Sequence, residues 1–312
     1  MTNTKDKLRE RLGLGSPTEI PLLSANNLDL ANRGIEEKDA RGLLERIKSV
    51  SAAPLVAYLV FDTTTSMDFI INAARECIGN IGRELLGAGK NLEVAVLGAG
   101  DHCDEVRLRH QGVKLLGNYG QFNDPTTNVG VLEQQIKKIV GTGGGDEPEA
   151  YECLAADLAQ IISQDKIRND RKKHVVVFFG DSRPHQGKAR MDDHGCPEGR
   201  GPEQLLILAA IADHSYFVDC QQKGDFLERE GYLTTAQKNV SVFEKYTFGI
   251  VQDSEKVTLV KFEQAKNFLP EAIIGMVKKV QGLEEYKKYL DQLPSEKKEK
   301  VMGLLGPGYE KR

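Results

Sequence analysis

From Pro54 onward, short apolar runs alternate with segments of helical periodicity, and this alternation limits the possible folds more than any other feature. "LVAYLVF" (55–61) and "KHVVVFFGD" (173–181) are nearly continuous apolar runs of strand length. Such runs are typical of strands that are buried on both faces of a parallel sheet. Because helical segments lie between them, the sequence predicts an α/β fold: a doubly wound, mostly parallel central sheet flanked by helices.

The expected strands and helices follow one another through residues 54–281. Further strands are predicted at 92–100, 215–220 and 256–262, with a weaker edge strand at 105–111. Apolar residues at helical spacing predict helices over 67–87, 129–140, 147–163, 203–213 and 265–280. We interpret 54–281 as one domain.

Two extensions flank this domain. Residues 1–53 contain loop-rich segments and an amphipathic helix at 35–50, and they are interpreted as an N-terminal extension. Residues 282–312 are interpreted as a C-terminal helical tail, with two charged helices separated at Pro294. A tail of this kind usually packs on the edge of a domain or on a partner.

Composition narrows the function classes. A formal net charge of −4 over 312 residues gives no electrostatic footprint for nucleic acid. The five cysteines are scattered and form no C-x-x-C pair, which favours a reducing compartment over a disulfide framework. The longest apolar run, "LLILAAIA" (205–212), is too short to span a bilayer, and the N-terminus has no apolar signal region. We therefore expect a cytoplasmic protein that binds neither nucleic acid nor membrane.

Acidic and hydroxyl side chains follow two of the predicted strands. "DTTTS" (62–66) comes directly after the first strand, and Asp181 closes "KHVVVFFGD". The glycine-dense turn "GTGGGD" (141–146) lies between them in sequence. In an open parallel sheet, ligands bind outside the carboxyl ends of the strands. The topology is therefore expected to bring these three features to one edge.

These residue types indicate a hard divalent cation. Asp62, Thr64 and Ser66 alternate, so in an extended loop their side chains point the same way. Together with Asp146 and Asp181 they make an oxygen-only site suited to Mg²⁺, or to Mn²⁺ or Ca²⁺. This site needs no Cys or His, which argues against zinc in it. The alternative for "DTTTS" alone is structural, because Asp, Thr and Ser also cap helices and Ser66 precedes one.

"DTTTS", "GTGGGDEPEA" and "VVVFFGDSRPH", in this order, resemble the von Willebrand factor A (VWA) domain with its metal-ion-dependent adhesion site. The resemblance covers roughly 54–280. More narrowly, "GAGDHCDE" (98–105), "GGGDEPEA" and "GDSRPH…DDHGCP" resemble the intracellular A domains found beside alpha-kinase domains and in related microbial proteins.

The resemblance implies the ligands by position. Asp62, Thr64 and Ser66 match the family's first loop, and Asp181 matches its third. The second loop departs from the usual Thr, since that position falls near Gly145 or Asp146; we favour Asp146, with Thr142 as the weaker candidate. The implied function is Mg²⁺-dependent protein–protein interaction or complex assembly, in which a partner's acidic side chain completes the metal shell.

Three other functions were weighed against this one. The same acids could serve a metal-dependent phosphoester hydrolase, although neither a nucleophile nor a general base is evident beside them. "GTGGGD" lacks the Lys and Ser/Thr of a phosphate-binding P-loop. "DTTTS" has Thr64 where aspartyl phosphatases resembling D-x-D-x-T carry a second acid, so the general acid is missing.

A second metal site stays open in two polar loops, 101–105 and 185–196. Mixed clusters of His, Cys and Asp can bind zinc, but the spacing here matches no standard zinc finger. Asp101 and His102 could instead bond to loop backbone. The candidates are His102, Cys103, Asp104, His185, Asp192, Asp193, His194 and Cys196.

Overall fold

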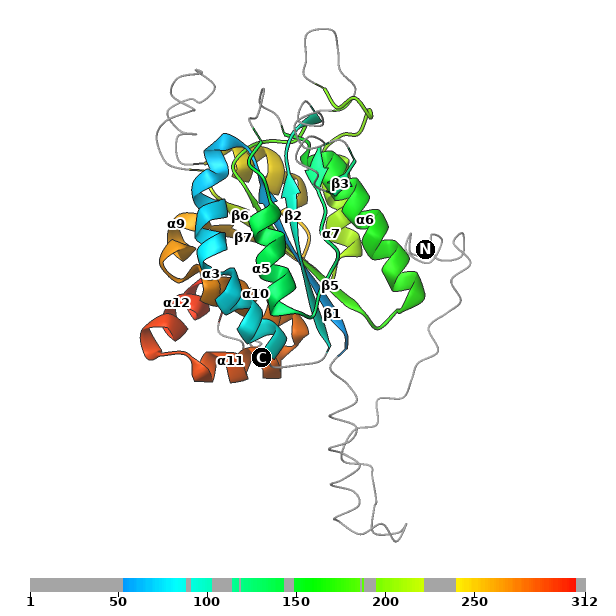
Figure 1. Ribbon diagram of the computed structural model, residues 1–312. Helices are drawn as coiled ribbons and strands as arrows, with labels where there is room; N and C mark the ends of the chain where they lie inside the picture. Colours follow the sequence, from blue (N-terminus) through cyan, green and yellow to red (C-terminus); the bar gives the residue numbers. More distant parts are fainter. Residues whose placement is uncertain are drawn as a thin grey trace, which may run out of the picture. The chain divides into compact units, whose positions relative to one another are not determined.

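The structure is a computed structural model. It describes residues 53–87, 91–102, 114–117, 119–142, 149–185, 187, 195–221 and 240–306 (Figure 1). The chain divides into two units, Met1–Ala52 and Ala53–Arg312, and the described residues all belong to the second. The predicted N-terminal extension therefore lies outside the described residues, apart from Ala53, and so does the predicted strand at 105–111.

A seven-stranded sheet forms the centre, in the order β3-β4-β2-β1-β5-β6-β7. Five strands pair in parallel, and the two-residue strands β3 and β4 add an antiparallel edge. This confirms the predicted doubly wound, mostly parallel α/β fold. The strands are β1 (Leu55–Asp62), β2 (Leu92–Ala99), β3 (Leu115–Leu116), β4 (Gly120–Gln121), β5 (Lys173–Gly180), β6 (His214–Asp219) and β7 (Val257–Lys261).

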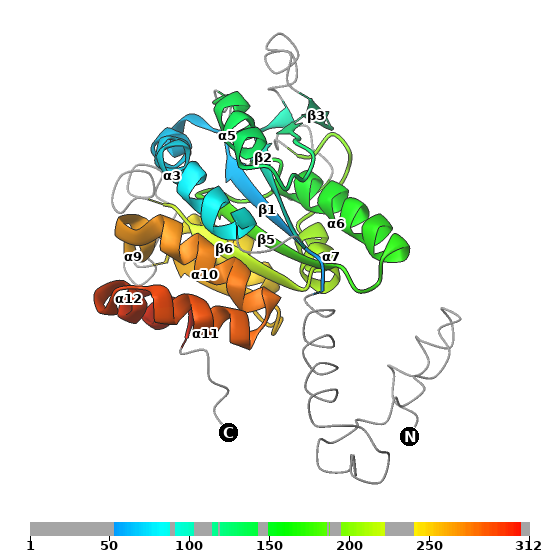
Figure 2. The same ribbon diagram turned by 60° about the horizontal axis from the view of Figure 1, so that its bottom comes forward.

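The central strand β1 is buried at all eight positions because helices cover both faces of the sheet (Figure 2). Its residues alternate between two cores, with Leu59 and Phe61 in one and Tyr58 and Val60 in the other. The helices that supply the first core are α3 (Asp68–Gly87), α5 (Val129–Lys138) and α10 (Leu269–Gln281); the second uses α6 (Tyr151–Arg168) and α7 (Glu203–Ile211).

Short helical segments complete the connections. The predicted helix at 67–87 begins with a 3₁₀ turn, and the predicted helix at 265–280 is divided into three pieces. A π-helical segment, η6, follows β6 and was not foreseen. These segments are η3 (Thr65–Met67), η6 (Phe243–Phe248), α8 (Gly249–Val251), α9 (Phe262–Ala265) and η7 (Lys266–Phe268). No helix among the described residues has both the length and the apolar character needed to cross a membrane.

The C-terminal helices α11 (Leu283–Gln292) and α12 (Ser295–Leu305) pack against α10 (Figure 2). They break at Leu293 and Pro294, as the sequence indicates. Val301 and Leu305 on α12 are buried, and both lie within about 3 Å of where a side chain on Gly275 would begin. These two helices therefore enlarge the core on the α10 side of the sheet.

Shortening Leu305 should destabilise the protein. Leu305→Ala removes buried methyl groups and leaves a cavity against α10, so we expect the free energy of unfolding to fall by about 2–5 kcal/mol. Glu299→Ala, at an exposed position on the same helix, should change it by less than about 0.5 kcal/mol. Urea denaturation followed by circular dichroism measures both. Equal small effects would mean that α12 contributes nothing to the core.

Candidate metal centre at the carboxyl edge of the sheet

β1 and β5 end side by side at the carboxyl edge of the sheet. Phe61 pairs with Phe179 in the parallel register, and the two rings stack 4.8 Å apart. Asp62 is the last residue of β1, and Asp181 directly follows β5. Two of the predicted ligands, 119 positions apart in sequence, are thus placed at neighbouring strand ends.

Asp62 is fully buried, and its carboxylate accepts three hydrogen bonds. The Thr64 backbone N–H and hydroxyl donate to Oδ1 at 2.8 and 2.7 Å, and the Tyr151 hydroxyl donates to Oδ2. The Thr64 hydroxyl also lies 3.2 Å from that of Ser66. The alternating residues of the loop therefore do interact with one another, on the Asp62 side.

Thr63, the first of the two intervening threonines, points away from this group. The Thr63 hydroxyl donates to the carbonyl of Ala99 on β2 at 2.9 Å. Thr63 is therefore a spacer between the alternating side chains. The alternating residues also differ in exposure: Asp62 and Thr64 are buried, whereas Ser66 is exposed. The group thus begins beneath the surface and reaches solvent at Ser66.

The pKa values of both acids are raised above their ordinary values. Burial raises the pKa of Asp62, and the nearby charge of Asp181 raises it further, while hydrogen bonds from Tyr151 and Thr64 oppose the shift. Burial also raises the pKa of Asp181, with Asp219 adding to the shift and a hydrogen bond from Ser66 opposing it. A bound cation would relieve this repulsion. Carboxylate and hydroxyl oxygens are ligands that Mg²⁺ accepts, so these residues fit that ion.

Of the two second-loop candidates, Thr142 and Asp146, the structure describes only Thr142. Thr142 is buried, and its backbone N–H donates to the Thr63 carbonyl at 2.7 Å. Its hydroxyl lies 3.1 Å from the Thr63 hydroxyl. The Thr142 carbonyl also accepts a hydrogen bond from the Thr65 hydroxyl at 3.5 Å. Thr142 is thus bonded to the two intervening threonines, Thr63 and Thr65. Asp146, the favoured candidate, lies outside the described residues.

Two residues at this edge were not foreseen. Tyr151 opens α6 and reads in sequence as one more apolar position of a helix, so nothing marks it as a partner of Asp62. Asp219 ends β6 as Asp62 ends β1, and that position was a usable signal. However, Lys261 and the Ser241 hydroxyl each approach Asp219 to 2.6 Å. Within the part of the chain that is described, no Lys or Arg forms an ion pair with Asp62 or Asp181.

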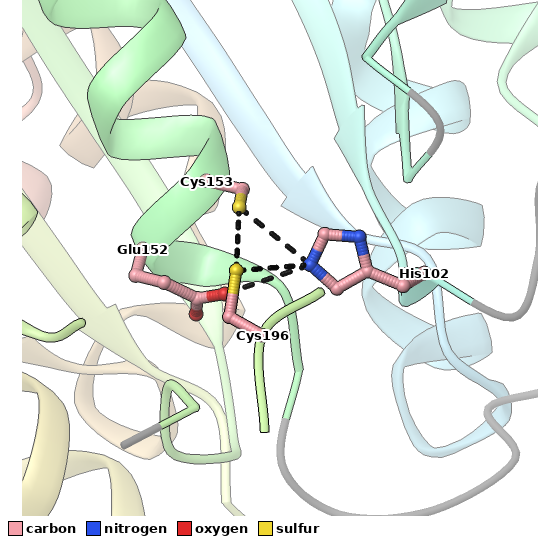
Figure 3. Close-up of side chains that lie close together, drawn as sticks. All are labelled: His102, Glu152, Cys153 and Cys196. Atoms are coloured by element: carbon pink, nitrogen blue, oxygen red, sulfur yellow. Dashed lines mark hydrogen bonds and ion pairs between the residues drawn. The ribbon is translucent and has the colours of Figure 1, made fainter. Parts of the chain in front are cut away.

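A second cluster lies one residue further along α6. Glu152 and Cys153 in the first turn of α6, His102 beyond the end of β2, and Cys196 in the connection to α7 point toward one another (Figure 3). One ligand atom from each lies within 4.8 Å of all the others. The Glu152, Cys153 and Cys196 side chains are buried, and that of His102 is 7% exposed.

His185 and Asp101 surround this second cluster. His185 Nδ1 lies 3.1 Å from Glu152 Oε1, and the His185 backbone N–H donates to Oε2 at 3.1 Å. The Asp101 carboxylate accepts the His102 backbone N–H at 2.6 Å and lies 3.4 Å from His185 Nε2. These contacts lower the pKa of Glu152 to about 2, because hydrogen bonds from His102 and His185 outweigh the opposing effect of its burial.

The two polar loops singled out in the sequence are thus partly brought together. His102, His185 and Cys196 meet, whereas Cys103, Asp104, Asp192, Asp193 and His194 lie outside the described residues. Glu152 and Cys153 were missed, because they belong to a predicted helix and not to either loop. A carboxylate and a thiol side by side in the first turn of that helix were the available signal.

No family model and no curated protein matches the sequence. Among solved structures, the pilus adhesin SpaC from Lactobacillus rhamnosus GG, in its open conformation, is similar with a TM-score of 0.48 and 12% identity, over 72% of this chain and 30% of the adhesin. Another form of SpaC gives 0.47 and 13%, over 72% and 31%. The VWA domain of SpRpn10 gives 0.38 and 11%, over 67% and 87%. The chain therefore spans less than a third of the adhesin.

Removing the Tyr151 hydroxyl should weaken the protein more than an equivalent change elsewhere. Tyr151→Phe leaves a fully buried carboxylate one donor short, and we expect a loss of about 1.5–3 kcal/mol of stability without divalent metal. Tyr119→Phe is the matched control, because Tyr119 donates to Asp157, which is partly exposed and keeps its bond to Arg200. Urea denaturation in EDTA compares the two. Equal losses would contradict a special role for the Tyr151–Asp62 bond.

Proposed function

We propose that this chain is an intracellular VWA-type module that binds Mg²⁺ at the carboxyl edge of its sheet and uses the ion in protein–protein interaction. One observation carries the proposal. The buried Asp62 is linked through Thr64 to the exposed Ser66, and Asp181 directly follows the neighbouring strand β5. The donor atoms of these four side chains are all oxygen, and oxygen ligands are those that a hard divalent cation prefers.

The exposure of the group supports a role in binding. Asp62 and Thr64 are buried, Asp181 is half-buried and Ser66 is exposed. An ion held by these residues would be accessible from the Ser66 side. A carboxylate from a partner protein, Asp or Glu, would then complete its coordination shell. The ion supplies positive charge at a place where the described residues offer none of their own.

The second loop sets how strongly such an ion would attract a partner. If Asp146 joins the shell directly, a third carboxylate offsets more of the cation's charge and weakens the attraction for an external acid. If Asp146 acts through water, or Thr142 contributes instead, the ion stays electron-poor. The first arrangement favours a mainly structural ion, and the second favours a ligand-recruiting one.

Neutralising either acid should weaken Mg²⁺ binding. Asp62→Asn and Asp181→Asn keep the side-chain shape but remove the charge, so we expect at least about a tenfold loss of affinity, or about 1.4 kcal/mol, in isothermal titration calorimetry. Asp219→Asn is the control: this carboxylate also ends a strand, but it is already paired with Lys261. The Mg²⁺ affinity of the Asp219→Asn variant should differ from that of the wild type by less than about threefold.

The same titration separates the second-loop candidates. Asp146→Ala should lower Mg²⁺ affinity more than Thr142→Ala, because Thr142 is bonded to Thr63. Unchanged affinity in Asp146→Ala would remove Asp146 from the site. Mg²⁺ binding of equal strength in wild type, Asp62→Asn and Asp181→Asn would overturn the site as a whole.

Partner binding should depend on the ion. The tagged full chain, incubated with native cell extract, should retain in Mg²⁺ a protein that EDTA releases and that Asp62→Asn and Asp181→Asn fail to retain. Mass spectrometry identifies the protein, and Asp→Asn or Glu→Gln changes in it should locate the acid that reaches the ion. Retention at full strength in EDTA would contradict the proposal. Mg²⁺-dependent turnover of a phosphoester, lost in Asp62→Asn, would replace interaction with hydrolysis.

A further inference from the structure

We propose that His102, Glu152, Cys153 and Cys196 form a structural zinc site, separate from the oxygen-only group around Asp62. Four different side chains from three separate parts of the chain converge on one small volume (Figure 3). Nitrogen, sulfur and carboxylate oxygen are the ligands that zinc takes in proteins. The two sulfur donors disfavour Mg²⁺ and Ca²⁺, which take oxygen ligands.

The distances within the cluster fit a tetrahedral ion. In a tetrahedron with Zn–S of about 2.3 Å and Zn–N or Zn–O of about 2.1 Å, neighbouring ligand atoms lie about 3.4–3.8 Å apart. His102 Nε2 lies 3.5 Å from Cys153 Sγ, 3.6 Å from Cys196 Sγ and 3.7 Å from Glu152 Oε1. The two sulfurs are 3.2 Å apart, somewhat closer than that geometry requires.

Cys153 and Cys196 are not joined by a disulfide in this cluster. The sulfurs of a disulfide are about 2.05 Å apart, and both cysteines are free thiols here. A disulfide would also not account for the close approach of the His102 ring nitrogen and the Glu152 carboxylate to the two sulfurs. On binding Zn²⁺, the two thiols would release their protons to solvent, and the resulting thiolates would bind the ion.

The surroundings are those of a closed, structural site. Four protein ligands fill a tetrahedral shell and leave no position for water or substrate. His185 holds the Glu152 carboxylate at 3.1 Å, and Asp101 accepts the backbone N–H of His102. Outer contacts of this kind orient the ligands of zinc sites. The ion would join the end of β2, the first turn of α6 and the segment that leads to α7.

Elemental analysis of the full-length chain tests the proposal. The protein, purified without chelator and dialysed against metal-free buffer, should contain about one zinc per chain. Cys153→Ser and Cys196→Ser should lose most of it, whereas Cys77→Ser, which alters a thiol on α3, should keep it. Asp62→Asn should also keep it, so that a failure of the Mg²⁺ site is distinguished from a failure of this one.

Wild-type protein supplies a test that does not depend on variants that fold. After zinc is removed and replaced by Co²⁺, a tetrahedral site with two thiolates should give sulfur-to-cobalt charge-transfer absorption and strong visible bands. Glu152→Gln should keep the sulfur-to-cobalt band. It should lower the affinity for zinc at least about tenfold, as is typical when a ligand, or a residue hydrogen-bonded to a ligand, is replaced. Wild type that takes up no zinc, that binds Co²⁺ without a sulfur band, or that forms a Cys153–Cys196 disulfide instead would overturn the proposal.

Discussion

The hydrogen bond from the Tyr151 hydroxyl to Asp62 joins the first turn of α6 to the end of the central strand. A fully buried carboxylate is costly unless donors surround it, so this contact stabilises the placement of the first turn of α6 beside Asp62. The Tyr151 ring packs edge-on against Phe178 at 4.8 Å. A side chain on Gly180 would begin 2.8 Å from the Tyr151 hydroxyl. The end of β5 must therefore be glycine for Tyr151 to reach Asp62.

Three consecutive residues of α6 connect the two candidate metal sites. Tyr151 contacts the oxygen-only group, and Glu152 and Cys153 belong to the second cluster. Successive residues of a helix point about 100° apart, so one helical turn can serve both places without sharing a ligand. Whatever fixes α6 at the second cluster also holds the Tyr151 hydroxyl at Asp62. Contacts in the second cluster would thus help to position the Tyr151 hydroxyl beside Asp62.

The sequence predicted the parts of the fold that rest on periodicity and missed those that rest on contact. The apolar runs of β1 and β5 predicted the parallel sheet, because strands covered on both faces have nearly continuous apolar sequences. The strands β3 and β4 have two residues each, and they are defined by pairing alone: β4 pairs with β2, and β3 pairs with β4. No local sequence pattern marks them. The spacing of Asp62, Thr64 and Ser66 predicted side chains that face the same way, and their hydroxyl and carboxylate groups do contact one another. Cys153 was hidden because a buried helical cysteine looks like any small apolar residue.

Asp219 shows why two of the three strand-end acids are better candidates for a cation than the third. All three terminate or directly follow parallel strands at one edge, so position alone does not distinguish them. Asp219 is balanced by Lys261, which also contacts Glu244. Burial raises the pKa of both Asp62 and Asp181, and the charge of Asp181 raises that of Asp62 further. Among the described residues, their hydrogen-bond partners are hydroxyl and backbone groups. Among the described residues, the buried Asp62 and the half-buried Asp181 thus have only neutral hydrogen-bond donors to offset their charge. This is why we propose a divalent cation there. Its oxygen donors would select a hard ion, whereas the thiols of the second cluster would select a softer one.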